Sequence, residues 1–287
     1  MKHPMRRRSV CAAFLAAWGL PQRALAQAAV PLEIGVLPNL SARVLLAQYQ
    51  PLRDYLAREL RRPVQVSTAP GWPAFHQRTL GLEYDLVVTA ANLARIAQLD
   101  RGCVPLLGYE PNIKGLVVSA NARPLKAIGD LGGQTLVLSN PPSLVSLRGL
   151  RWLAENRLQP GRDFKLVDTP TDDSVGNVVA RGDAAAALLS GGEFRAMPDA
   201  LRAQLQVLTT FAEVPGFVVL ASPRLDLGAA REMKALWLMF ASGSDEGKAF
   251  FAASGFSGMR ELPAGLMESM DTDVDATRRA LAVPAPR

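Results

Sequence analysis

Short apolar runs rich in β-branched residues alternate with segments of helical periodicity along most of this 287-residue chain. The first set starts at the run 32–37, LEIGVL, and ends at the run 103–109, CVPLLGY. The second set starts at 134–139, QTLVLS, and ends at 206–213, QVLTTFAE. Strands that alternate with helices favour a mainly parallel sheet with helices on its faces. Each set therefore predicts one α/β unit.

Two further apolar runs, GLVVSA at 115–120 and FVVLAS at 217–222, lie where one set gives way to the other. They predict two chain crossings between two lobes, and the chain is long enough for two modest domains. The predicted fold is α/β and bilobed, with two mixed or parallel sheets flanked by helices and a two-strand hinge. We expect residues 27–118 and 217–287 to form lobe 1, and residues 119–216 to form lobe 2.

One long helix is expected early in the first set. Leu45, Tyr49, Leu52 and Leu56 recur at helical spacing in SARVLLAQYQPLRDYLAREL and give it one apolar face. Pro51 lies in the middle of this segment. Because proline lacks an N–H group and clashes with the preceding turn, we expect it to kink the helix or to start a second one.

The N-terminus, MKHPMRRRSVCAAFLAAWGLPQRALAQA, has the three parts of a secretory signal peptide. A cationic start precedes the apolar stretch 10–20, and Ala24-Leu25-Ala26 is a small-x-small cleavage site. We expect residues 1–26 to be removed on export. This segment holds five Lys and Arg and no acidic residue, so its loss lowers the formal charge of +6 by five. The remaining charge gives no support for nucleic-acid binding.

Few residues suited to covalent chemistry remain beyond the predicted signal peptide. The chain keeps one cysteine, Cys103, and one histidine, His76. One cysteine cannot form an internal disulfide, and we expect it to be a small buried hydrophobe. A Ser-His-Asp triad would need His76, and no G-x-S-x-G motif accompanies it. We therefore expect no catalytic residue, no metal site and no cofactor.

Short polar residues follow several of the expected strands. In open α/β sheets, ligands bind beyond the carboxyl ends of the strands, where helix N-termini offer N–H groups and partial positive charge. The same residue types cap any helix, so each corner alone also fits a plain cap. Trp72 stands in a loop between a glycine and a proline and is a candidate cleft wall. The predicted ligand-binding residues are Asn39, Ser41, Trp72, Thr89, Asn92, Ser139, Ser143, Ser146 and Asp173.

The segment 34–66, IGVLPNLSARVLLAQYQPLRDYLARELRRPVQV, resembles the opening of PhnD-like phosphate/phosphonate ABC-transporter periplasmic substrate-binding proteins. The segment 124–164 resembles their second-lobe Asp-Leu-x-Gly strand, serine-bearing helix start and Pro-x-x-Asp-Phe exit. YDLVVTAANLARIA, VVARGDAAAALLSG, VPGFVVLASPRLD and SDEGKAFFAASGF continue the match over nearly all of the mature chain. The resemblance implies a type II periplasmic-binding fold, whose two lobes close on a ligand about a hinge.

Two corners of this sequence differ from the family pattern. The family often carries Ser-Thr-Ser at the start of a second-lobe helix, where this chain has Ser143, Leu144 and Val145, followed by Ser146. A histidine is common at the next corner, where this chain has the acidic stretch TDDS at 171–174. Carboxylates there would repel a phosphonate dianion at close range. We therefore expect a ligand that is less highly charged or more apolar than a phosphonate.

The resemblance implies a periplasmic solute-binding protein of an ABC uptake system, which binds a small polar or anionic organic solute in an interlobe cleft. Its expected partners are this small-molecule ligand and a membrane permease, with no nucleic acid, and the protein is expected to be a monomer. A sensory protein coupled to a membrane kinase would need the same cleft. A lyase on the same fold is a third hypothesis, with Asp172, Asp173 or Glu193 as its general acid or base.

Overall fold

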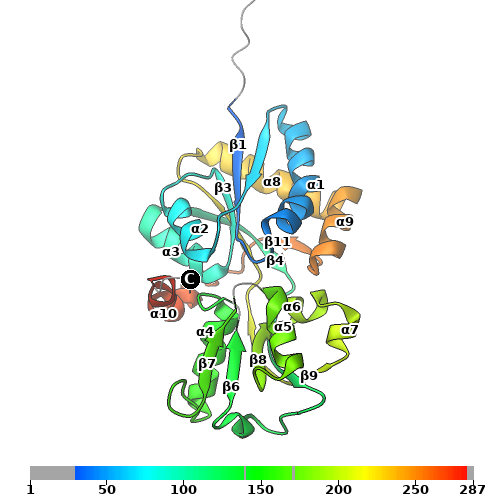
Figure 1. Ribbon diagram of the computed structural model, residues 1–287. Coiled ribbons are helices and arrows are strands. Elements are labelled where there is room, and N and C mark those ends of the chain that lie inside the picture. The colour runs from blue at the N-terminus through cyan, green and yellow to red at the C-terminus, as the bar shows by residue number, and fades with distance from the viewer. Residues whose placement is uncertain (1–29, 139, 170–171, 283–287) are drawn as a thin grey trace, which may run out of the picture.

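The computed structural model describes residues 30–138, 140–169 and 172–282, without the side chains of residues 172 and 173. Figure 1 shows two lobes, one above the other, each built around its own sheet. The first lobe holds a six-stranded sheet in the order β11-β4-β10-β3-β1-β2, and the second holds a five-stranded sheet in the order β7-β6-β8-β5-β9. The predicted α/β architecture of two mixed sheets flanked by helices is confirmed. The predicted signal peptide, residues 1–26, lies outside the described residues.

The elements of the two lobes follow one another in three stretches of chain. The first lobe begins with β1 (Leu32–Val36), α1 (Ala42–Leu60), β2 (Val64–Ser67), α2 (Trp72–Leu80), β3 (Leu86–Thr89), α3 (Ala91–Arg101) and β4 (Val104–Glu110). The second lobe holds β5 (Ile113–Ala120), η1 (Ile128–Leu131), β6 (Thr135–Leu138), α4 (Leu144–Glu155), β7 (Lys165–Asp168), α5 (Asp172–Arg181), β8 (Ala186–Ser190), α6 (Gly191–Ala196), α7 (Asp199–Arg202) and β9 (Leu205–Val214). The chain then returns with β10 (Val218–Ala221), α8 (Leu227–Gly243), α9 (Asp245–Ser254), β11 (Gly258–Arg260), η2 (Glu268–Met270) and α10 (Asp271–Ala282).

The first-lobe sheet is mixed and covered on both faces. β1 pairs in parallel with β2 and β3, whereas β10 lies antiparallel between β3 and β4. Every residue of β3 and β10 is buried, which explains why these strands appear as continuous apolar runs. On one face, Trp237 and Phe240 of α8 pack with α1 and α9, and on the other, Phe75 of α2 packs with α3.

The second-lobe sheet is also mixed. β6 pairs in parallel with β7 and β8, and β5 pairs antiparallel with β8 and β9. Leu153 of α4 packs on one face, and Val175 and Val179 of α5 pack on the other. This topology directs the carboxyl ends of β6 and β8, and so the N-termini of α4 and α6, toward the first lobe (Figure 1).

The chain changes from one sheet to the other at two adjacent places. β4 ends at Glu110 and β5 begins at Ile113, while β9 ends at Val214 and β10 begins at Val218. Ile113 and Val214 are paired in the sheet register, so the two crossings run side by side. The predicted first boundary, at residue 118, falls inside β5. We propose instead that the chain passes from one lobe to the other at these two crossings.

The long first-lobe helix runs from Ala42 to Leu60 as one helix with Pro51 inside it, so Pro51 does not start a second helix. Its buried face holds Leu45, Tyr49 and Leu52, which pack against the first-lobe core. This packing keeps the helix continuous despite the hydrogen bond that Pro51 cannot donate. Among the described residues, no helix has both the length and the apolar character needed to cross a membrane.

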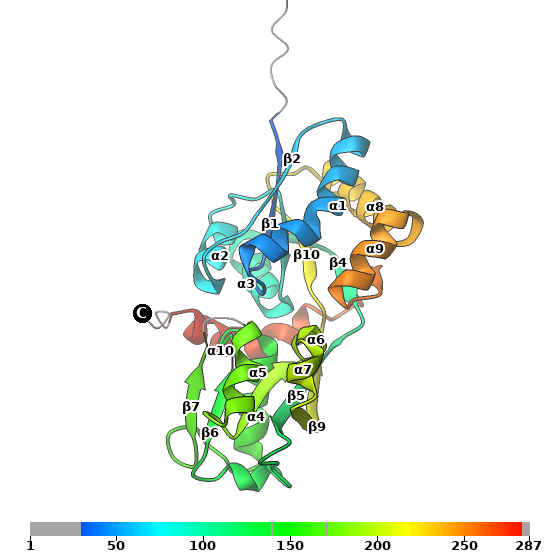
Figure 2. The same cartoon turned by 45° about the vertical axis from the view of Figure 1, so that its right-hand side comes forward.

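The C-terminal helix α10 lies between the two lobes at one side of the molecule, as Figures 1 and 2 both show. It packs against α3 and α2 of the first lobe and against α4 of the second. Asp273 of α10 is fully buried and accepts hydrogen bonds from Arg148 and Arg151 of α4. Arg278 of the same helix pairs with Asp100 of α3 at 2.7 Å. The last described helix therefore contacts and bonds to both lobes.

Candidate functional site

A cavity of about 1040 Å³ lies between the lobes and takes its walls from both of them. The first lobe contributes the loop after β1, part of α1, and residues near the start of α2 and the ends of β4 and α9. The second lobe contributes the N-terminal turn of α4 and most of α6. The two crossings form one further wall. This is the position at which open α/β sheets bind ligands.

The N-terminus of α4 forms the polar part of the cavity wall. Ser143 is the N-cap, and its Oγ accepts a hydrogen bond from the Ser146 amide at 3.1 Å and donates one to the Ser146 hydroxyl at 3.0 Å. The Leu147 amide donates to the Ser143 carbonyl. The first amides of a helix have no partner within it. Among the described residues, the N–H groups of Leu144 and Val145 have no acceptor outside the helix either. Both residues line the cavity.

Trp72 also lies on the cavity wall. It is the first residue of α2 and is only 6% exposed. Its indole Nε1 is buried and has no hydrogen-bond partner among the described residues. The ring belongs to the same apolar cluster as Leu144 and Val145, which places it where the two lobes meet. This nitrogen has almost no accessible surface, so it does not face the cavity, and its missing acceptor is a cost to the fold.

A second helix start faces the cavity from β8. Ser190 caps α6 through a hydrogen bond from the Glu193 amide to its Oγ at 3.0 Å. Glu193 returns the contact, because its carboxylate accepts from the Ser190 amide at 2.5 Å. This reciprocal pair is a capping box. The Glu193 carboxylate, a candidate acid or base in the sequence, therefore serves to hold α6.

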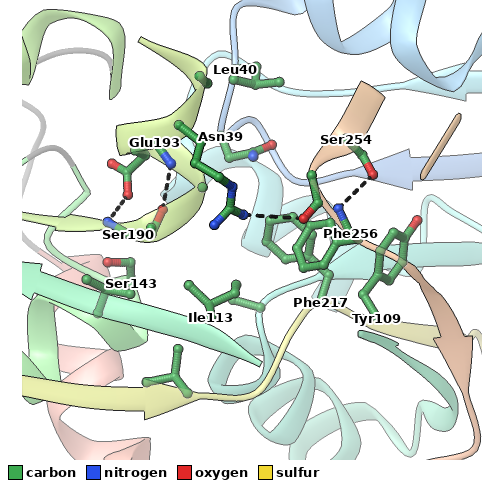
Figure 3. A pocket seen from close by; sticks show the side chains of 18 of the residues that line it. Asn39, Leu40, Tyr109, Ile113, Ser143, Ser190, Glu193, Phe217, Ser254 and Phe256 are labelled. Atoms are coloured by element: carbon green, nitrogen blue, oxygen red, sulfur yellow. Dashed lines mark hydrogen bonds between the residues drawn. The ribbon is translucent and has the colours of Figure 1, made fainter. Parts of the chain in front are cut away.

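Aromatic rings form the opposite part of the cavity wall. Tyr109, Phe217 and Phe256 pack against one another with ring centroids 5.2–6.0 Å apart. In Figure 3 these three lie on one side of the view, and Ser143, Ser190 and Glu193 lie on the other. The aromatic rings come from the first lobe, and the three polar residues come from the second.

A pair of tyrosine hydroxyls lies beside these rings. The hydroxyls of Tyr49 and Tyr109 are 3.1 Å apart, and both residues are buried and line the cavity. Burial raises the pKa of both phenols, so both stay protonated at neutral pH. One hydrogen bond uses one of their two hydroxyl hydrogens. The second hydrogen has no acceptor among the described residues, and it is available to an oxygen atom in the cavity.

Formal charges on the cavity wall are balanced. The charged lining residues are Lys114, Arg195, Arg260, Glu110, Glu193 and Glu213. Arg260 pairs with Glu110 at 3.1 Å, and Lys114 is opposite Glu213 in the β5–β9 register. Arg195 donates to the carbonyl of Gly255 at 3.3 Å, a contact that joins α6 of the second lobe to the end of α9 in the first. The cavity therefore has no excess of formal positive charge.

The structure places three of the nine predicted ligand-binding residues on the cavity wall, namely Asn39, Trp72 and Ser143. Ser41 is the exposed N-cap of α1, and Thr89 is buried at the end of β3. The predicted site residues Ser139 and the side chain of Asp173 lie outside the described part of the chain.

The remaining two predicted residues are buried and bonded within the protein. Asn92 donates from Nδ2 to the carbonyl of Pro142 and to Thr277 Oγ1, both at 2.9 Å. It therefore joins the first lobe to the loop before α4 and to α10. Ser146 is 2% exposed and lies under the Ser143 hydroxyl. The contribution of each of these residues to binding stays a prediction.

Sequence reasoning did not select the aromatic wall. Tyr109 and Phe217 stand in apolar runs and Tyr49 lies on the apolar face of a predicted helix, where an aromatic residue usually belongs to a core. Ser190 was also missed, although SGGE fits the capping-box pattern at the end of an apolar strand. That pattern was the one local signal that marked the second helix start at the cavity. Across the described ranges, no group of three or more His, Cys, Asp or Glu side chains is arranged to hold a metal ion.

Residues 34–264 match the family described as ABC transporter, phosphonate, periplasmic substrate-binding protein. The chain belongs to this family. It is thus a periplasmic substrate-binding protein of an ABC transporter. The resemblance inferred from the sequence is confirmed, and the family is one of transport binding proteins rather than enzymes. Membership in this family implies a small-molecule ligand, a membrane permease as partner and a periplasmic location.

Solved structures of phosphonate and sulphonate binding proteins have a similar fold. PhnD1 from Prochlorococcus marinus, in complex with methylphosphonate, gives a TM-score of 0.78 at 14% identity, covering 88% of this chain and 98% of that chain. A binding protein component of an ABC phosphonate transporter from Pseudomonas aeruginosa gives 0.74 at 14% identity, with coverages of 89% and 90%. The periplasmic aliphatic sulphonate binding protein SsuA from Escherichia coli gives 0.63 at 16% identity, with coverages of 89% and 94%. A comparison with curated proteins gives no match.

Proposed function

We propose that this phosphonate-family protein delivers a small organic anion to its permease and holds the acidic group at the N-terminus of α4. The observation that carries this proposal is that the amides of Leu144 and Val145, two residues on the wall of the interlobe cavity, have no acceptor among the described residues. Helix N-termini attract anions through unpaired N–H groups and the helix dipole. The relatives that bind methylphosphonate and aliphatic sulphonates support an oxyanion as the acidic group.

Ligand binding would draw the lobes together about the two crossings. The α4 amides belong to the second lobe and the aromatic rings to the first, so a ligand that touches both favours the closed arrangement. The bond from Arg195 of α6 to the carbonyl of Gly255 already joins the two lobes, which supports such a closure. We propose that residues 1–26 are removed during export and that the mature protein is a monomer. Its closed form is the one that the permease recognises.

Titration calorimetry on residues 27–287 tests this function with a fixed set of probes: methylphosphonate, phenylphosphonate, methanesulfonate and benzenesulfonate. We expect saturable binding of one molecule per chain for at least one probe. The absence of binding by all four would overturn the proposed ligand class.

A pair of variants at one position tests the role of the α4 amides. Leu144→Pro removes the N–H group at the first helical position, where proline is tolerated and where the preceding residue, Ser143, already has an extended backbone. Leu144→Ala removes the side chain and keeps the amide. Because a hydrogen bond to a charged group contributes roughly 1.5–3 kcal/mol, the proline variant should bind the tightest probe about tenfold or more weakly than the alanine variant. Equal affinities would place the anion elsewhere.

A further inference from the structure

The first turn of α4, a second-lobe helix, is buried against the first lobe. Leu144 is 3% exposed and Val145 is 7% exposed, and both belong to the same apolar cluster as Trp72, Ala90 and Ala91 of the first lobe. Separation of the lobes at this place would return apolar surface to water, which is unfavourable in proportion to the area exposed. Apolar packing therefore holds the lobes together on the α4 side of the cavity.

Buried polar side chains connect the same three helices, α3, α4 and α10. Asn92 of α3 donates to the carbonyl of Pro142, which precedes α4, and to the Thr277 hydroxyl of α10. Thr277 in turn donates to the carbonyl of Asp273 at 2.7 Å. The residues Asn92, Thr277 and Asp273 are all fully buried. Because a buried polar group that loses its partner is costly, these bonds resist a small separation of the lobes.

Ion pairs join α10 to both lobes. Toward the first lobe, Asp271 accepts a hydrogen bond from Arg95 of α3 at 2.7 Å. Toward the second lobe, the Asp273 carboxylate accepts from Arg148 and Arg151 of α4, both at 2.9 Å. We call the whole interlobe contact on this side the α10 interface, which comprises Asn92, Leu144, Val145, Arg148, Asp273 and Thr277.

The lobes are joined more loosely between α1 and the α6–α7 region. Leu40 and Val44 of the first lobe line one part of the cavity there, and Ala196 of the second lobe lines another. The bond from Arg195 to the carbonyl of Gly255 is long, at 3.3 Å, and exposed. Such a bond can be exchanged for one to water with little change in free energy. Figures 1 and 2 show α6 and α9 on the opposite side of the molecule from α10.

We propose that the α10 interface stays closed in the ligand-free protein and that the cavity opens only between α1 and the α6–α7 region. The two chain crossings and the α10 interface are two separate fixed contacts, and together they define one axis of rotation for the lobes. The first turn of α4 therefore keeps its place against the first lobe before a ligand arrives. This inference rests on the lobe closure of the proposed function, and it adds the side on which the lobes part.

Pulsed electron paramagnetic resonance on ligand-free residues 27–287 tests this asymmetry with two pairs of spin labels. The labels are attached to cysteines introduced at exposed positions in a Cys103→Ala background. One pair, at Leu99 of α3 and Glu155 of α4, spans the α10 side, and the other, at Ala47 of α1 and Ala200 of α7, spans the opening side. The first pair should give one narrow distance distribution, and the second a distribution roughly twofold wider or with a second, longer distance. Equal widths, or a second distance for the first pair, would overturn the proposal.

Variants of α10 and α4 test the cause of the narrow distance. Asp273→Asn removes both ion pairs to α4 and should widen the distribution of the first pair roughly twofold. Arg151→Gln is the milder variant, since this arginine is 45% exposed, and it should widen the distribution less. Asp275→Asn, an exposed change on the same helix, should leave the distribution as in the wild type. A width that none of these variants changes would overturn the role of the α10 interface.

These measurements need no ligand, so their outcome is independent of the calorimetric test of the proposed function. If every sulfonate and phosphonate probe failed to bind, the proposed ligand class would be wrong, and the spin-label distances would still decide which side of the cavity opens.

Discussion

The carboxylate of Asp273 lies 2.9 Å from the guanidinium of Arg148, and this contact joins the C-terminal helix to the helix that begins at the cavity. Arg151, one turn further along α4, approaches the other carboxylate oxygen at 2.9 Å. Asp273 is fully buried, whereas the two arginine side chains are 24% and 45% exposed. Because α10 also packs on α3 of the first lobe, this carboxylate positions α4 relative to both lobes.

Removal of this charge should destabilise the protein. Asp273→Asn loses the charge-assisted hydrogen bonds from Arg148 and Arg151 and leaves both guanidinium groups facing a neutral amide. We expect a loss of about 2 kcal/mol in the free energy of unfolding, measured by urea denaturation. Asp275→Asn on the same helix is the control, because Asp275 is exposed and should change stability by less than about 0.5 kcal/mol. Equal losses in the free energy of unfolding would show that the buried ion pairs of Asp273 contribute no more to stability than an exposed carboxylate does.

The single histidine of the described chain gives a dependence of stability on pH. His76 is 7% exposed on α2, and burial lowers its pKa to about 4 from an ordinary value near 6.5. Between these values the unfolded chain binds a proton that the folded chain does not, so stability falls as the pH is lowered from 6.5 to 4. We expect this residue to account for about 2–3 kcal/mol of that fall.

The variant His76→Gln isolates the histidine contribution. It removes the titrating group, so its stability should change less than that of the wild type between pH 6.5 and pH 4, in urea denaturation at matched ionic strength. Above pH 7 the difference between the two proteins should be constant. Parallel curves over the whole range would contradict a buried neutral histidine.

The alternation of strands and helices was predictable because it depends on local composition. Strands such as β3 and β10 are buried on both faces, and a strand buried in this way must be apolar throughout. Ser143 was predictable for the same reason, since a helix cap is a local arrangement of one side chain and an amide three residues later. The continuity of α1 through Pro51 was not, because it depends on packing against the first-lobe core.

The composition of the cavity wall depends on contacts between distant segments, which a single sequence does not reveal. Tyr49 and Tyr109 are 60 residues apart, and only the fold brings their hydroxyls together. Asn92 has a residue type suited to ligand binding, but it bonds to Pro142 and Thr277, which are 50 and 185 residues away. The residue types in the sequence were enough to predict polar side chains near the lobe boundary. Which of these side chains remain available to a ligand depends on the fold.

The two roles of Ser143, as helix cap and as part of the cavity wall, can be separated with a second capping serine. Ser143→Ala should lose about 1 kcal/mol of stability, because the Ser146 amide loses its acceptor. It should also weaken binding of the tightest sulfonate or phosphonate probe, because the first turn of α4 loses its fixed geometry beside the ligand. Ser244→Ala is the control, since Ser244 caps α9 through the Gly247 amide and lies outside the cavity wall. It should lose similar stability in thermal denaturation and keep full affinity in calorimetry; equal affinity losses would reduce Ser143 to a plain cap.

The crossing before β10 is closely packed at Gly216. A Cβ added there would overlap the carbonyl oxygen of Tyr109, and the neighbouring Phe217 carbonyl accepts a hydrogen bond from the Tyr109 amide at 2.8 Å. Gly216→Ala should therefore push the two crossings apart and cost about 2 kcal/mol in urea denaturation. It should also weaken binding of benzenesulfonate, since Tyr109 and Phe217 both line the cavity. Gly243→Ala is the matched change, because a Cβ at Gly243, the last residue of α8, meets no atom within 4 Å. That variant should be as stable as the wild type or slightly more stable, and an equally small effect at Gly216 would mean that the crossings tolerate a wider separation than the structure indicates.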